Sequence, residues 1–143
     1  MHIQIGTSSE LIEKAQSIRH QVFVIEQAIP QSLDLDGLDH SAHHIVITDD
    51  DTLVATARLL LDEYNNAVLA RIAVMKPYRD KGIASTLIHA IVEHAEKLQA
   101  VGIDIHAHEY LRHYYEKFGF NFIKHVEKVG EHQLIAMHNP LSG

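Results

Sequence analysis

Apolar and polar positions along the chain follow two different periods, and the changes of period divide it into strands and helices. Residues His2–Ile5 alternate as in a short strand. Apolar side chains recur at helical spacing over Leu11–Val22 and again over Ile83–Leu98. Before that second helix, Val68–Val74 is an almost continuous apolar run, which is typical of a strand covered on both faces. The pattern therefore predicts a strand, a short loop and a long helix at the centre of the fold.

The start of the first helix carries a capping signal. Thr7, with Glu10 three residues later, matches a capping box, in which two side chains satisfy backbone N–H groups of the first turn. We expect the helix to continue or restart through Phe23–Ile25. The segment Gln27–His44 that follows has no regular period and is rich in aspartate. A loop of this length in a compact domain is typically functional or mobile.

The remaining segments give the element order β-α-β-β-β-α-β-α-β-β. We expect further strands at Ile45–Thr48, Leu53–Leu61, Ile103–Ala107, Phe120–Val126 and Gln133–His138, and a short helix at Tyr110–Phe118. Gly119 suits the position after that helix, and Asn139–Gly143 is expected to fray. The order predicts one domain, residues 1–143, of the α/β (α+β) class, with a mixed sheet and helices on both faces.

Composition excludes several functions. The chain has 12 Lys and Arg against 19 Asp and Glu, a formal net charge of −7, so the basic face of a nucleic-acid binder is not expected. No apolar run approaches the roughly 20 residues of a membrane span, and no signal peptide is evident. The absence of cysteine excludes disulfides, thiolate metal sites and a cysteine nucleophile, and it fits a cytoplasmic protein. The acidic balance favours cationic small molecules or peptides as partners.

The loop before the long helix is a candidate anion site. Arg79, Lys81 and Gly82 stand where the helix begins, and the backbone N–H groups of Gly82–Ser85 have no partner within the helix. Fixed positive charge, these N–H groups and the helix dipole together favour phosphate. Neither a GxGxxG nor a GxxxxGK[ST] motif is present, so the usual dinucleotide and nucleotide loops are not indicated.

Two motifs resemble those of the GNAT-type, acetyl-CoA-dependent N-acetyltransferases. The loop Arg79–Ala84 has the spelling R-x-x-G-x-A, similar to the family's pyrophosphate loop. Downstream, Tyr115, Gly119 and Phe120 match the family's Y-x-x-x-G-F, with a helix and a strand between the two motifs. A third segment, Val22–Pro30, is similar to the V-F-V-x-E-Q-x-x-P of an ElaA-like and YjcF-like subgroup. The resemblance extends from the first strand to the last hairpin.

The resemblance implies a fold and a reaction. It implies a mostly antiparallel sheet in which Val68–Val74 and Ile103–Ala107 form a parallel, splayed pair that receives the pantetheine arm. It implies transfer of acetyl from acetyl-CoA, as cosubstrate, to a primary amine of a small molecule or peptide by direct attack, without a metal. A backbone N–H near Val74 would stabilise the oxyanion. The implied cofactor-binding residues are Ile72, Ala73, Val74, Arg79, Lys81, Gly82, Ile83, Ala84, Ser85, His108 and Tyr115.

The resemblance also suggests catalytic and substrate-binding residues. Tyr115 is our candidate acid, because a phenol with a pKa near about 10 is protonated at neutral pH and can donate to a thiolate with a pKa near about 8.5. Glu26 is our first choice of base, with His43, His44 and His108 as alternatives. Substrate-binding candidates are Arg71, His43 and His44; Arg71 would bind a substrate carboxylate or form a structural ion pair.

Several departures and alternatives stay open. His108 stands where the family often has asparagine, and Asp80 where glycine is common. A non-catalytic acyl-CoA-sensing module is the alternative function, and a metal-binding histidine protein built on His106 and His108 is a third. The spacing of Asp34 and Asp36 before Gly37 resembles part of a calcium loop but lacks the downstream glutamate. The family also suggests a homodimer, and the acceptor amine is not identified.

Overall fold

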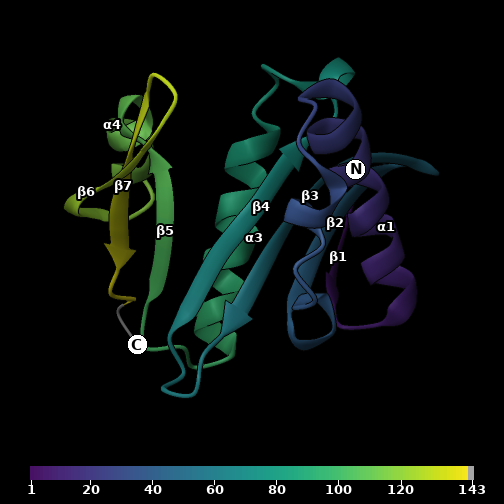
Figure 1. Cartoon of the computed structure of the whole chain (residues 1–143). Coiled ribbons are helices and arrows are strands. Elements are labelled where there is room, and N and C mark those ends of the chain that lie inside the picture. The colour runs from purple at the N-terminus through teal and green to yellow at the C-terminus, as the bar shows by residue number, and fades with distance from the viewer. Residues whose placement is uncertain (142–143) are drawn as a thin grey trace.

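The chain folds into one mixed sheet with helices packed on both faces, as the sequence predicts (Figure 1). The structure is a computed structural model and describes residues 1–141. The strands lie in the order β1-β2-β3-β4-β5-β7-β6. They are β1 His2–Gly6, β2 His43–Asp49, β3 Thr52–Leu61, β4 Ala67–Val74, β5 Ile103–His108, β6 Asn121–Val129 and β7 His132–Asn139. The helices are α1 Ser9–Arg19, α2 Gln31–Asp34, α3 Ile83–Lys97 and α4 Arg112–Glu116; a π-helical stretch, His20–Glu26, extends α1.

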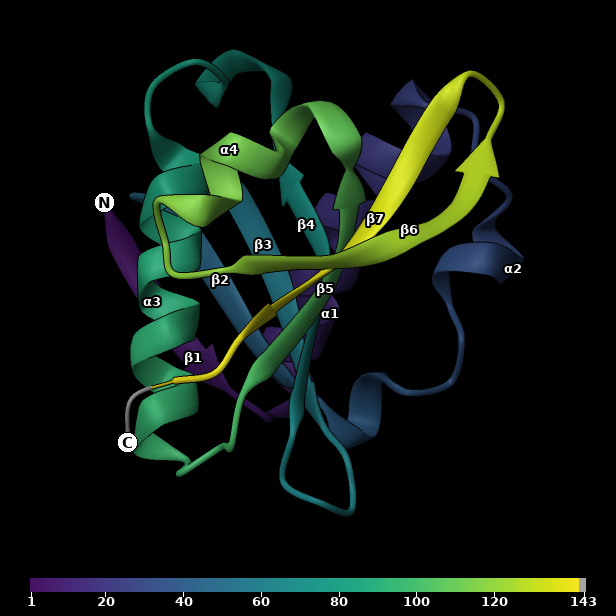
Figure 2. The same cartoon turned by 90° about the vertical axis from the view of Figure 1, so that its left-hand side faces the viewer.

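Helices α1 and α3 cover opposite faces of the sheet (Figure 2). The apolar stripe of α3, with Leu87 and Ile91 fully buried, packs on the side of the sheet that includes Ile45 of β2. On the other side, Ile18 of α1 packs against Val46, the next residue of the same strand. The alternation of β2 therefore supplies both cores, and burying each such side chain contributes about 2 kcal/mol. In the described part of the chain, no helix is long and apolar enough to span a membrane.

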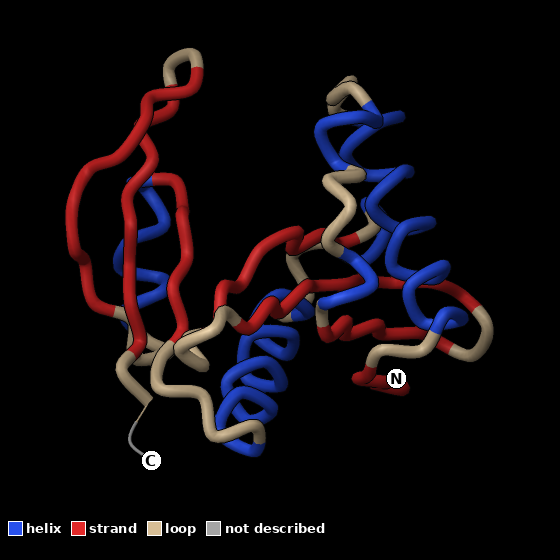
Figure 3. The backbone as a smooth tube through the Cα atoms, turned by 60° about the horizontal axis from the view of Figure 1, so that its bottom comes forward, coloured by secondary structure: helices blue, strands red, loops and turns tan. Residues whose placement is uncertain are grey.

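Among residues 1–141, β4 and β5 form the one parallel pair of the sheet, and the two strands separate after the first two residue pairs of their ladder. Ala67 pairs with Ile103 and Val68 with Asp104, and the ladder between the strands then stops. Beyond that point β5 stays paired with β7, so β5, β7 and β6 lean away from the rest of the sheet (Figures 1 and 3). The predicted splayed pair is therefore confirmed, and its gap opens toward α4 and the beginning of α3.

Some local predictions are wrong by one residue or more. The cap of α1 is Ser8, whose Oγ accepts from the Leu11 N–H at 3.2 Å, rather than Thr7. The helix expected at Tyr110–Phe118 is shorter, because a 3₁₀ turn occupies Glu109–Leu111 before α4. Asn139 is buried at the end of β7 instead of frayed, and residues 142 and 143 lie outside the described part.

Candidate active site

A cavity occupies the gap between β4 and β5. Its volume is about 600 Å³, and most of its walls are apolar. The β strands contribute Leu69, Ala70, Arg71, Ile72, Ile105, His106, Ala107 and His108; the helices and loops contribute Phe23, Ile29, Leu33, Asp34, Ala84, Leu111, Tyr114 and Tyr115. Since the backbone edges of two strands face each other without a ladder, the gap offers hydrogen-bonding groups to an inserted amide chain. This is the shape and chemistry that a pantetheine arm requires.

Tyr115 lies at the α4 side of this cavity. Its side chain is 9% exposed, and its ring meets the edges of Tyr114 and Phe120. Burial, with smaller contributions from nearby tyrosines, raises the pKa of Tyr115 to about 12. The phenol is therefore protonated at neutral pH and can donate a hydrogen bond into the cavity. Gly119, at φ 92°, ends the turn that follows α4 and lets Phe120 turn back against Tyr115.

A second cavity, of about 470 Å³, lies at the beginning of α3. Its walls are Val74, Tyr78, Arg79, Asp80, Gly82, Ile83, Ala84, Ser85 and Tyr114. Gly82 caps the helix at φ 78°, and Asp80 also has a positive φ, 62°, so glycine would suit both positions. The backbone of the first turn of α3 lines this region, and its unpaired N–H groups make the region a candidate anion site. Tyr114 lines both cavities, and its hydroxyl lies 3.0 Å from Oγ of Ser85.

Arg79 and Glu26 bind each other. Two guanidinium nitrogens of Arg79 donate to the Glu26 carboxylate at 2.5 and 3.0 Å, and Nε donates to the carbonyl of Val74 at 2.9 Å. The hydrogen bonds from Arg79 hold the pKa of Glu26 below its usual range. Glu26 stays a predicted base, but this pairing weakens it as a proton acceptor. Lys81, by contrast, extends over the ring of Tyr78, 5.9 Å from its centroid.

The predicted substrate-binding histidines do not line either cavity. His44 is fully buried, with Nε2 2.9 Å from the carbonyl oxygen of Asp39, and burial lowers the pKa of His44. His43 faces α3, where its Nδ1 lies 3.1 Å from Nε2 of His94. His108 does line the larger cavity; its Nδ1 is buried and makes no hydrogen bond among residues 1–141. The structure therefore brings His108, but neither His43 nor His44, to the cavity that Tyr115 lines.

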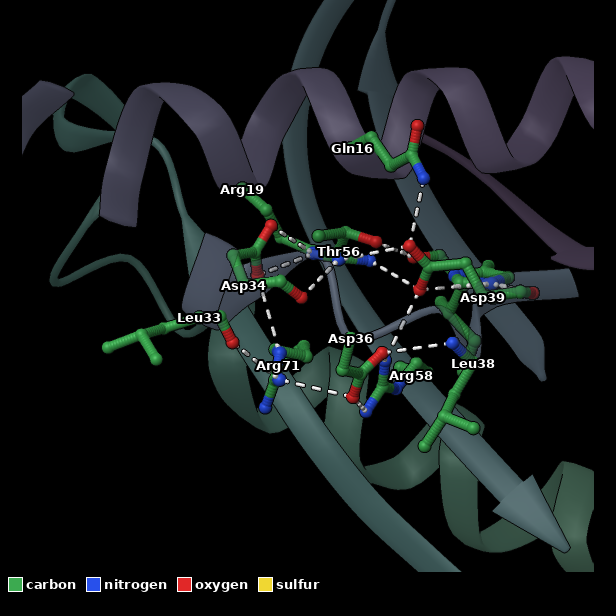
Figure 4. Close-up of polar contacts among 12 residues, drawn as sticks. Gln16, Arg19, Leu33, Asp34, Asp36, Leu38, Asp39, Thr56, Arg58 and Arg71 are labelled. Atoms are coloured by element: carbon green, nitrogen blue, oxygen red, sulfur yellow. Dashed lines mark hydrogen bonds and ion pairs between the residues drawn. The ribbon is translucent and has the colours of Figure 1, made fainter. Parts of the chain in front are cut away.

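A cluster of arginines and aspartates holds the loop between α1 and β2 against the sheet (Figure 4). Arg19, on α1, binds Asp34 through Nε at 3.0 and 3.2 Å, and Asp39 through its two terminal nitrogens at 2.9 and 3.1 Å. Arg58, on β3, binds Asp36 at 2.8 and 2.9 Å. Burial raises the pKa of Asp39, but hydrogen bonds from Arg19 and Gln16 outweigh it and hold that pKa well below its usual range.

Arg71 connects this cluster to the cavity. Its Nη2 lies 3.3 Å from an oxygen of Asp36 and 3.3 Å from the Leu33 carbonyl, and its Nε lies 3.3 Å from Asp34. The sequence pattern singled out Arg71 and the loop, but not Asp34, Leu33 or Ile29 as wall residues. Nothing in local periodicity marks those three positions, because only the fold brings them to β4.

The splayed strands, the anion site beside them and the buried tyrosine define an acyltransferase of the acetyl-CoA-dependent type. The family model described as "Acetyltransferase (GNAT) family" matches residues 10–120, so the chain belongs to that family. Its relatives include the uncharacterized N-acetyltransferase YjcF of Bacillus subtilis, 29% identical over 128 residues that cover 89% of this chain and 90% of YjcF. Protein ElaA of Escherichia coli is 33% identical over 109 residues, which cover 72% of this chain and 70% of ElaA.

Solved structures show the same fold. The crystal structure of Escherichia coli ElaA superposes with a TM-score of 0.85 and 26% identity, covering 96% of this chain and 98% of ElaA. A Bacillus subtilis acetyltransferase solved in complex with CoA superposes with a TM-score of 0.73 and 19% identity, covering 98% of each chain. The subgroup resemblance seen in the sequence is therefore confirmed.

Proposed function

We propose that this protein transfers the acetyl group of acetyl-CoA to a primary amine of a small molecule or peptide. The observation that carries the proposal is the cavity between β4 and β5, which has Tyr115 in its wall and the beginning of α3 beside it. The CoA complex of the Bacillus subtilis neighbour supports a CoA site in this fold. A cytoplasmic location and homodimer formation stay predictions from the sequence.

The residues of the two cavities suit the two ends of the cofactor. The first-turn N–H groups of α3, with Arg79 and Lys81, would hold the pyrophosphate, and the facing edges of β4 and β5 would bind the pantetheine amides. Acetyl-CoA supplies the activated acetyl thioester. Because Glu26 already binds Arg79, a pyrophosphate must compete with that carboxylate or be held mainly by the N–H groups and Lys81.

Tyr115 has a defined role in this proposal. A phenol with a pKa of about 12 is a weaker acid than a thiol with a reference value of about 8.5, and the difference corresponds to roughly 5 kcal/mol against full proton transfer. We therefore assign Tyr115 a hydrogen bond to the departing sulfur, which stabilises the developing thiolate without ionising the phenol.

The acceptor ammonium must lose a proton before it attacks, and a group other than Tyr115 must accept that proton. Of the four bases considered from the sequence, His108 alone lines the cavity in the described structure. An imidazole can accept a proton near neutral pH, and His108 is the last residue of β5, on the opposite side of the gap from β4. We propose His108 as that base, directly or through a water molecule, in place of Glu26.

The test is turnover. Acetyl-CoA and the protein are mixed with amino acids, polyamines, amino sugars and short peptides, and released CoA is measured with a thiol reagent; the chain has no cysteine to add background. Amine-dependent thiol release supports the proposal. Acetyl-CoA binding by calorimetry without any release would support the sensing module instead, and absence of binding would overturn both.

A further inference from the structure

Arg71 occupies an irregular position in β4. The register of β3 and β4 shifts between Thr56 and Arg58, so that β4 carries one extra residue opposite Ala57, and Arg71 stands there with φ 57°. A positive φ is unfavourable for a residue with a long side chain, and such conformations persist where the surroundings fix them, often at ligand sites. The bulge takes Arg71 out of the strand's alternation and places it in the cavity wall.

The guanidinium of Arg71 has hydrogen-bonding capacity to spare. Of its five N–H donors, only those on Nη2 make hydrogen bonds, and both acceptors are 3.3 Å away. Nε lies 3.3 Å from Asp34 but makes no hydrogen bond, and Nη1 makes none with any residue from 1 to 141. Arg19, in the same cluster, makes five hydrogen bonds, all within 3.2 Å. Figure 4 shows a terminal nitrogen of Arg71 with no dashed line.

The aspartates near Arg71 have stronger partners than Arg71. Asp34 accepts from Arg19 at 3.0 Å, and Asp36 accepts from Arg58 at 2.8 Å. The charge of Arg71 is therefore only loosely committed within the cluster, while a quarter of its side chain, 26%, is exposed toward the cavity. A cation with spare donors in a mostly apolar wall is suited to an anionic group of a bound molecule.

We propose that Arg71 binds a carboxylate of the acceptor, so that the acceptor is an amino acid with an apolar side chain. The bound group should carry a single negative charge, because the carboxylates of Asp34 and Asp36, each 3.3 Å from Arg71, would repel a dianion such as a phosphate. The apolar side chain follows from Phe23, Ile29 and Leu33, which form the cavity wall on the α2 side. This inference rests on the proposed function and names its substrate class.

The experiment compares each amino acid with its amide. Values of kcat/KM are measured for leucine against leucinamide, and for phenylalanine against phenylalaninamide, in the wild type, Arg71→Gln, Arg71→Lys and Arg58→Lys. The amide removes the carboxylate and keeps the side chain. Amine basicity also differs within each pair, but that difference is the same for every enzyme and cancels when the acid-to-amide ratios are compared.

We expect the wild type to prefer the acids, and Arg71→Gln to lower the acid-to-amide ratio roughly 10- to 100-fold, the usual effect of losing charge-assisted hydrogen bonds. Arg71→Lys keeps the positive charge, so its acid-to-amide ratio should lie between those of the wild type and Arg71→Gln. Arg58→Lys disturbs the same cluster from a residue outside the cavity wall and should keep the wild-type ratio. A purely structural Arg71 would lower both rates together and leave the ratio unchanged, which would overturn the inference.

The outcomes separate this inference from the proposed function. Turnover of amines with no preference for the acids, or with the same ratio in Arg71→Gln, leaves the acetyltransferase proposal standing and refutes the carboxylate site. If no amine releases thiol, binding of N-acetylleucine and N-acetylleucinamide in the presence of CoA is measured by calorimetry. Equal affinities for these two probes in the wild type would also refute the carboxylate site. If Arg71→Gln does not fold, the wild-type and Arg71→Lys ratios decide.

Discussion

The substitution Asp36→Asn tests how much the ion pair of Asp36 with Arg58 stabilises the loop that forms part of the cavity wall. Asp36 accepts from both terminal nitrogens of Arg58, at 2.8 and 2.9 Å, and from the backbone N–H of Leu38 at 3.1 Å. The hydrogen bonds from Arg58 lower the pKa of Asp36 from 3.8 to about 2. That difference corresponds to roughly 2 kcal/mol of stability. Because the side chain is 27% exposed, solvent screening reduces the expected value to about 1–2 kcal/mol.

The pH dependence of this contribution has a definite sign. The folded-state pKa of Asp36 lies below its unfolded value, so the contribution is fully present above about pH 4 and is lost as the pH falls toward about 2. We expect Asp36→Asn to lower the free energy of unfolding by about 1–2 kcal/mol at pH 7 and pH 5, and by clearly less at pH 3. At pH 3 the carboxylate is still mostly ionised in the folded wild type but largely protonated in the unfolded chain, so folding must release a proton and part of the stabilisation is lost.

The assay is urea unfolding followed by circular dichroism, at the three pH values, for the wild type, Asp36→Asn and the control Asp51→Asn. Asp51 lies exposed in the turn between β2 and β3 and should change stability by less than about 0.5 kcal/mol. A destabilisation by Asp36→Asn of the same size at all three pH values would show that the carboxylate's charge is not its source. If Asp36→Asn destabilises the protein at pH 7 no more than Asp51→Asn does, the stabilising role of the Asp36 carboxylate is refuted.

Three further predictions concern catalysis. Tyr115→Phe should lower kcat by about 10²-fold or more and leave the KM for acetyl-CoA nearly unchanged. The control Tyr114→Phe, at the neighbouring residue, should keep most of kcat. An unchanged kcat in Tyr115→Phe would remove Tyr115 from the mechanism. Arg79→Gln should raise the KM for acetyl-CoA about tenfold. Glu26→Gln should lower this KM or leave it unchanged, because the Glu26 carboxylate no longer competes with the pyrophosphate for Arg79. A large loss of kcat in Glu26→Gln would instead restore Glu26 as the base. His108→Gln should lower kcat by about 10²-fold with the KM for acetyl-CoA nearly unchanged, and an unchanged kcat would exclude His108 as the base.

The parts of the fold that could be predicted are those that depend on patterns of residues close together in the sequence. The apolar run of β4, the loop with Gly82 and the helical stripe of α3 appear where the periodicity places them. The Tyr115, Gly119 and Phe120 motif likewise marks the end of α4 and the wall of the cavity. Each depends on residues close in sequence, for which spacing alone specifies geometry.

The roles of individual charged residues could not be predicted in the same way. Glu26 and Arg79 are 53 residues apart, and only the fold shows that they bind each other. The apolar run predicts a regular strand at Arg71, but the bulge at this residue changes the direction of its side chain, and no glycine marks the bulge. His44 follows the aspartate-rich loop as a binding residue would, yet it is the second residue of β2 and its side chain is buried against Asp39 of the cluster.

The carboxylates of the aspartate-rich loop bind arginines of this chain. Asp34, Asp36 and Asp39 have a spacing that resembles part of a calcium loop, but each carboxylate binds a guanidinium instead. Arg19, Arg58 and Arg71, from α1, β3 and β4, bring three positive charges to the three negative ones. A divalent cation would add charge to a cluster that is already balanced, and the desolvation of buried arginines would be left uncompensated if it displaced them. The loop is therefore better understood as a wall of the cavity between β4 and β5, held against the sheet by these ion pairs.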